Sequence, residues 1–108
     1  MKAMTIGDMR HRLVIETPVD TVDENGDRRT AFQDAGEMWG LIEPTRGEAR
    51  FVADRPEYSI SHIVHARWRA DISAGMRLRS ADRKLRIRAV LNPDESKIQM
   101  LCLCEEAP

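Results

Sequence analysis

The stretch MRLRSADRKLRIRAVL, residues 76–91, alternates apolar and basic side chains on both sides of a polar break. Side chains two positions apart in a strand lie on one face, so this pattern predicts an antiparallel hairpin with two unlike faces. The apolar face should hold Met76, Leu78, Leu85, Ile87, Ala89 and Leu91. The opposite face should hold Arg77, Arg79, Arg86 and Arg88.

The same two-residue period recurs along most of the chain. It predicts strands over residues 11–19, 28–34, 58–70 and 97–104, and a separate apolar run from Gly36 that stops at Pro44. The 58–70 segment is long for one strand, which predicts a bend or bulge within it. The last segment is apolar on both faces, as is typical of a central or interface strand.

A tight turn separates the first two predicted strands. Asn25-Gly26 is a favoured pair for the two positive-φ positions of a two-residue hairpin loop, and acidic residues surround it. The sequence therefore predicts a β-hairpin arm that protrudes from the fold, with acidic residues at Asp20, Asp23, Glu24 and Asp27.

One short segment carries helix signals. Thr45 precedes Glu48 by three residues, which is the spacing of a capping box, and Pro56 would end the helix. We expect a short helix within an insertion at residues 44–58.

Length and composition predict a single domain, residues 1–108. No stretch approaches the roughly 20 apolar residues of a membrane span, and the first residues lack the apolar block of a secretory signal. Two cysteines close together are too few for a disulfide framework, which favours a reducing compartment such as the cytoplasm. The expected fold is an all-β, small antiparallel barrel or sandwich with one short helix and a protruding arm.

The formal net charge is −1, but the charges are unevenly distributed. Between Arg67 and Arg88 eight basic residues stand against two acidic ones. Two interpretations of the arginine-rich face remain open. It could be a solvated surface that prevents unwanted sheet pairing, or it could bind phosphates or acidic side chains, including the acidic arm of a neighbouring copy.

No catalytic, cofactor or metal site is predicted, because the sequence contains none of the usual nucleophile, phosphate-loop or metalloprotease motifs. Cys102 and Cys104 are expected to be buried apolar residues, since zinc needs more ligands than they supply. Trp39 and Trp68 are expected to be core or interface anchors.

The order of several short motifs resembles one known family. These motifs are RHR before the first strand, the acidic Asn-Gly arm, WGLIEP at 39–44, GEARF at 47–51, SHI at 61–63, RWR at 67–69, ISAGMR at 72–77 and IRAVLNPDE at 87–95. Together they are similar to the head closure proteins of tailed bacteriophages, also called head-tail adaptors or stoppers. The resemblance extends from about Met9 to Glu105.

The resemblance implies a structural protein without catalytic activity. It implies a ring, a hexamer or dodecamer, between the portal or adaptor proteins and the tail proteins of a phage or gene transfer agent. The ring would continue the channel for double-stranded DNA at the head–tail junction. The chain would be made in the bacterial cytoplasm and would have no membrane partner.

By position, the resemblance also implies roles for particular residues. The channel-facing residues would be Arg46, Gly47, Glu48, Arg50 and Arg55. Contacts with neighbouring subunits or the adjoining ring would be made by Asp23, Glu24, Asn25, Gly26, Asp27, Arg77, Arg79, Arg86 and Arg88.

A different class of protein is also compatible with the charge pattern. A stand-alone nucleic-acid-binding barrel of the OB type could use the basic strands to bind single-stranded DNA. In that case tight binding by the isolated protein would depend on Arg86 and Arg88.

Overall fold

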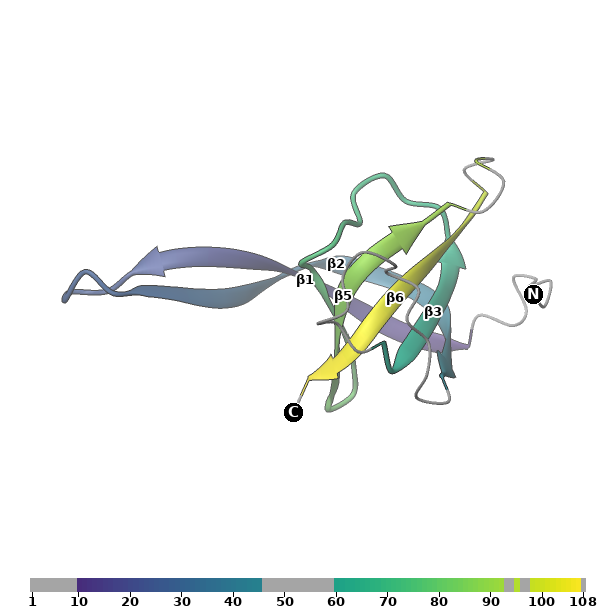
Figure 1. Ribbon diagram of the computed structural model, residues 1–108, viewed down its shortest axis with the longest axis horizontal. Helices are drawn as coiled ribbons and strands as arrows, with labels where there is room; N and C mark the ends of the chain where they lie inside the picture. Colours follow the sequence, from purple (N-terminus) through teal and green to yellow (C-terminus); the bar gives the residue numbers. More distant parts are fainter. Residues whose placement is uncertain (1–9, 46–59, 93–94, 96–97, 108) are drawn as a thin grey trace.

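The computed structural model describes residues 10–45, 60–92, 95 and 98–107. Within these residues, strands form one closed antiparallel barrel, ordered β1-β2-β3-β6-β5-β4 (Figure 1). The strands are β1 (His11–Val22), β2 (Arg28–Pro44), β3 (His62–Arg67), β4 (Arg77–Ser80), β5 (Arg83–Leu91) and β6 (Gln99–Ala107). The predicted all-β fold is confirmed. The predicted helix after Thr45 lies outside the described residues.

Alternating apolar residues build the interior of the barrel. Each strand contributes side chains to one hydrophobic cluster, which includes Leu13, Ile15, Met38, Val64, Ala66, Leu78, Leu85, Ile87, Met100, Cys102 and Cys104. The inward face of the 76–91 hairpin is therefore largely as predicted. Strand β6 pairs with β3 on one side and β5 on the other, and Leu103, on the face opposite Cys102 and Cys104, is also buried.

A bulge in β5 changes the predicted inward face of that strand. Ile87 lies opposite Cys104, while Ala89 lies opposite Leu103, so Arg88 is the extra residue. An extra residue reverses the alternation beyond it. The prediction that Ala89 and Leu91 face the core is wrong: Ala89 is half-buried, Leu91 is 41% exposed, and Val90 packs against the core instead.

Strand β2 also differs from the prediction of two separate runs. It is one continuous strand, because a second bulge absorbs the irregularity around Gly36. Ile15 pairs with Gly36 and Glu16 pairs with Asp34, which leaves Ala35 as the extra residue. Gly36 has a φ of 135°, a conformation that glycine adopts readily.

The 58–70 segment forms a shorter strand than predicted, His62–Arg67. Ile60, Val64 and Ala66 are buried, in agreement with the predicted inward face. His65, predicted to face outward, is also buried, and its Nε2 atom lies 3.1 Å from Glu43 Oε1. Beyond the strand, the amide of Trp68 donates to the carbonyl of Ile98.

The distal halves of β1 and β2 form the protruding arm. Their pairing continues to Val22 and Arg28, far from the barrel, and the molecule measures 50 × 30 × 27 Å (Figure 1). At the tip, Asp23 and Asp27 are joined by a backbone hydrogen bond, which makes the loop three residues long. Of these only Gly26 has a positive φ, so the predicted two-residue turn is wrong, although the arm itself is confirmed.

Candidate interaction surface

The four arginines predicted for the outward face of the 76–91 hairpin do point away from the core, but three of them bind carboxylates of their own chain. Arg77 Nε lies 2.6 Å from Glu16 Oε1, and Arg79 lies 3.5 Å from the other oxygen of Glu16 and 3.7 Å from Asp34. The Glu16 side chain is only 4% exposed. One buried carboxylate thus partly neutralises two guanidinium groups.

An aromatic ring lies beside this ion pair. The guanidinium carbon of Arg77 is 3.9 Å from the centroid of Phe32, and that of Arg86 is 5.0 Å from it. Both distances are within the range of cation–π attraction. We call Glu16, Phe32, Arg77, Arg79 and Arg86 the arm-root cluster, because it joins the base of the arm to β4 and β5.

A second group of ion pairs lies between β5 and β6. Arg88 Nη2 is 2.6 Å from Glu105 Oε1, and Arg83 Nε is 3.0 Å from Glu106 Oε2. The pairing of Arg83 holds the pKa of Glu106 below its usual value. Most guanidinium charge on this side of the barrel is therefore matched by carboxylates within the chain.

Sequence reasoning missed the two residues that organise the arm-root cluster. Glu16 looked like an ordinary outward residue of an alternating strand, and Phe32 lay in a segment with little pattern. Glu16 is separated from Arg77 by 61 residues, so only the tertiary fold brings them together.

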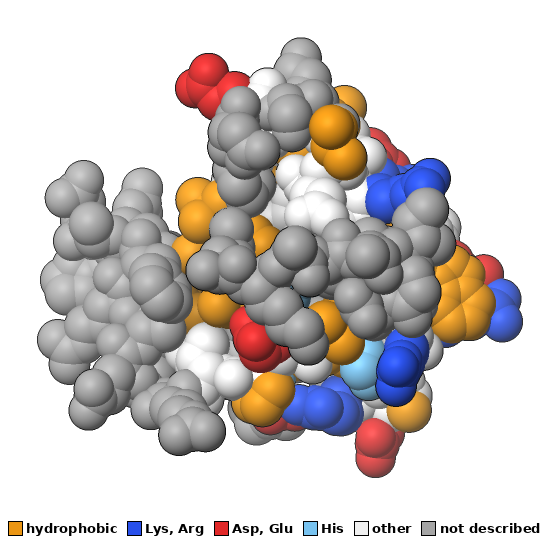
Figure 2. All heavy atoms as spheres, turned by 90° about the vertical axis from the view of Figure 1, so that its right-hand side faces the viewer, with side chains coloured by type: hydrophobic (Ala, Val, Ile, Leu, Met, Phe, Trp, Pro, Cys, Tyr) orange, Lys and Arg blue, Asp and Glu red, His pale blue; other side chains and the backbone are white. Residues whose placement is uncertain are grey.

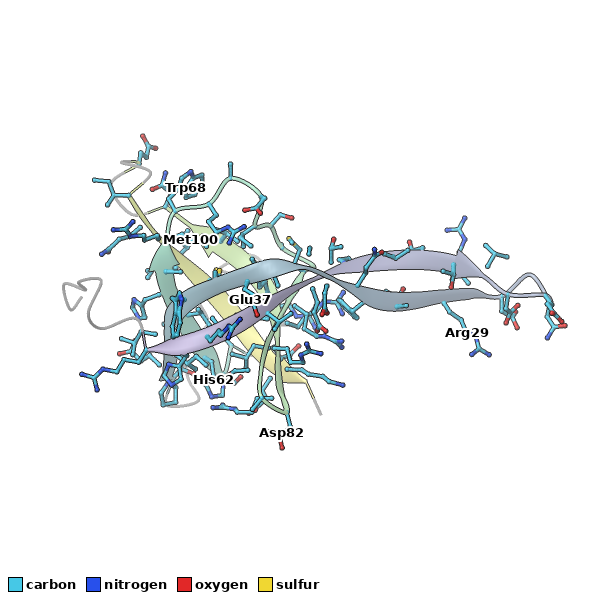
Figure 3. All side chains as sticks on the ribbon, turned by 180° about the vertical axis from the view of Figure 1, so that it is seen from behind. Arg29, Glu37, His62, Trp68, Asp82 and Met100 are labelled. Carbon is cyan, nitrogen blue, oxygen red and sulfur yellow. The ribbon has the colours of Figure 1, made fainter. Side chains whose placement is uncertain are left out.

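The acidic residues of the arm have different environments. Asp23 Oδ1 accepts hydrogen bonds from the amides of Asn25 and Asp27, and its other oxygen lies 3.5 Å from Arg29 Nε. Asp20 accepts a hydrogen bond from Thr30. Figure 3 shows Arg29 far out on the arm, with His62 and Asp82 on the barrel. The carboxylates of Asp20 and Asp23 are therefore already engaged by contacts within the arm.

The proposed channel residues Arg46, Gly47, Glu48, Arg50 and Arg55 all lie outside the described residues.

Of the two tryptophans, Trp68 packs against the core, whereas Trp39 is 57% exposed on the outside of the barrel. At the end of the molecule opposite the arm, hydrophobic, basic and acidic side chains are intermixed (Figure 2).

Ser61 and His62 form a hydrogen-bonded pair near the end of β6. Ser61 Oγ is 2.9 Å from His62 Nδ1, and Arg83 Nη2 is 2.7 Å from His62 Nε2. An arginine can only donate, so Nε2 is the acceptor and Nδ1 carries the proton of a neutral ring. The Glu106 amide also donates to Ser61 Oγ. The imidazole therefore donates to the serine hydroxyl, the reverse of what a general base does.

This arrangement predicts a pH dependence of stability. Burial, and then the nearby Arg83 charge, lower the pKa of His62 below 6.5, against a smaller opposing effect of Glu106. The unfolded chain then binds more protons than the folded chain, so stability should fall as the pH drops through 6.5 and below. In urea titrations between pH 7.5 and 5, His62→Gln should show a shallower fall than the natural chain. An equal fall in both proteins would contradict the arrangement.

Cys102 and Cys104 are buried and unpaired, as predicted. Burial raises the pKa of the Cys102 thiol to about 12 and raises that of Cys104 as well. Because the thiolate is the reactive form, neither thiol should react with a disulfide reagent at pH 8 in the folded protein, and both should react in denaturant. Rapid labelling of the folded protein would contradict the buried placement.

The described residues contain no group of three or more potential metal ligands. In the same part of the chain, no helix is long and apolar enough to cross a membrane.

Comparisons with known proteins give consistent matches. The family model described as phage head completion protein matches residues 4–107. The solution structure of a protein from Shigella flexneri 2a has a TM-score of 0.70 and 26% identity, covering 96% of this chain and 97% of that one. A chain in the virion of a native gene transfer agent particle has a TM-score of 0.67 and 23% identity, covering 91% and 94%. No curated protein sequence matches significantly.

Proposed function

Because the chain belongs to the phage head completion protein family, we propose that it assembles as a ring at the head–tail junction of a tailed phage or gene transfer agent. The ring lies between the portal or adaptor proteins and the tail proteins, and it continues the channel for double-stranded DNA. The match to the family over residues 4–107 is the observation that carries this proposal. The similar fold of a chain from a gene transfer agent virion supports it.

The molecule's shape and charge also suit a ring subunit. A closed barrel has no unpaired sheet edge, whereas the arm exposes the outer edges of two paired strands. A two-stranded ribbon is only marginally stable by itself in water, so a long arm favours a neighbour that supports it. Subunits that must meet in a fixed register commonly use such polar, complementary surfaces.

The arm-root cluster argues against the alternative of a stand-alone OB-type barrel. Single-strand binders present open aromatic rings for base stacking and unneutralised cations for phosphates. Here Phe32 is stacked against two guanidinium groups, and Arg77, Arg79 and Arg88 are paired with carboxylates. We expect fluorescence anisotropy to show only weak, salt-sensitive binding of single-stranded DNA. Tight binding that Arg86→Glu and Arg88→Glu abolish would favour the alternative.

Deletion of the gene tests the proposed function in the particle. Without this chain, heads should still fill with DNA, but they should neither retain it against nuclease nor carry tails. Electron microscopy and nuclease protection of the packaged DNA measure both outcomes. Tailed, nuclease-resistant particles at the normal yield would contradict the proposal.

A further inference from the structure

Arg86 is the one arginine of the hairpin's outward face without a carboxylate partner among the described residues. Its Nε atom is buried and has no hydrogen-bond acceptor. Its register neighbours do not supply one, because Arg77 is also a cation and Glu105 is paired with Arg88. The guanidinium is held beside Phe32, with no carboxylate of the described residues bound to it.

The tip of the arm carries the complementary feature. Glu24 and Asp27 are exposed, and their carboxylates make no hydrogen bond or ion pair within the described part of the chain. The carboxylate of Asp23 instead accepts hydrogen bonds from two backbone amides of the loop. The arm thus presents two unpaired anions at its far end.

These two features cannot meet within one copy. Arg86 contacts the arm at Phe32, and the five residues from there to Asp27 span about 16 Å of extended strand, directed away from the barrel (Figure 1). The arm tip of the same copy therefore cannot supply the anion for Arg86, whereas the arm tip of another copy can.

We infer that the carboxylates of Glu24 and Asp27 in one copy of this chain bind Arg86 of the next copy. A guanidinium binds a carboxylate through short, charge-assisted hydrogen bonds. Because the two surfaces lie on different parts of the chain, the contact is head-to-tail, which closes into a ring when the rotation permits. This inference rests on the proposed ring and specifies the residues of its contact.

Charge reversal tests the inference in particles made by a host that lacks the natural gene. Arg86→Glu alone should reduce the yield of tailed, DNA-retaining particles at least tenfold, and so should the tip variant Glu24→Arg with Asp27→Arg. Combining all three changes should restore the yield to within about threefold of the natural chain, because the pairing is re-formed with opposite signs.

Lys84→Glu is the matched control, since Lys84 lies on the same strand and also has no carboxylate partner in the described part of the chain. It should leave the yield within twofold. The tip residues are exposed, so the tip variant should fold even if Arg86→Glu does not, and circular dichroism checks both.

Two results would overturn the inference while leaving the proposed function intact. One is a normal yield from the tip variant when deletion of the gene abolishes tailed particles. The other is a loss in both single reversals that the combined variant does not restore. Normal particles after gene deletion would instead refute the proposed function itself.

Discussion

Replacing Leu85 with alanine should lower the free energy of unfolding by about 3 kcal/mol, whereas Leu91→Ala in the same strand should cost less than about 1 kcal/mol. Leu85 is fully buried opposite Leu78, so its removal leaves a cavity in the barrel. Leu91 lies beyond the bulge at Arg88 and is 41% exposed. The two leucines share one predicted face in an uninterrupted strand, and only the bulge separates them.

Urea unfolding followed by circular dichroism measures both variants. A similar loss for the two leucines would show that β5 continues without a bulge and that Leu91 faces the core. The comparison therefore tests the register of the hairpin as well as its burial.

The second large effect is expected at the arm-root cluster. Glu16→Gln keeps the size of the side chain but removes the charge that Arg77 and Arg79 share. Glu16 and Arg77 are only 4% and 18% exposed, so the loss leaves a cation poorly solvated. Breaking such a pair should destabilise the fold by about 3 kcal/mol.

Glu37→Gln is the matched control for this change. Glu37 pairs with Arg12 at the same 2.6 Å distance, but both side chains are half exposed or more, so water replaces the lost partner. Thermal unfolding should show a clearly lowered midpoint for Glu16→Gln and no measurable change for Glu37→Gln. Equal midpoints in the two variants would mean that Glu16 is not the buried counter-ion.

The sequence was sufficient to predict the elements whose signal is local. The alternation at Leu78, Leu85 and Ile87 indicated an inward face, and the Asn25-Gly26 pair between two strands indicated the arm. Both signals depend on neighbouring residues, and both agree with the structure.

The bulges and the arm-root cluster could not be predicted in the same way. A bulge at Arg88 changes the register without changing the alternating pattern of the sequence. The pairing of Glu16 with Arg77 joins segments that are distant in the sequence. The neighbours of Glu16 in the sequence therefore indicate a surface residue, and only the closed barrel shows that it is buried.

Electron cryomicroscopy of the neck of the assembled particle tests the central claim most directly. The account predicts a ring of copies of this barrel around the DNA channel between portal and tail, with the arm of each copy reaching its neighbour. A neck complete without this chain, in particles that retain DNA and carry tails, would contradict it.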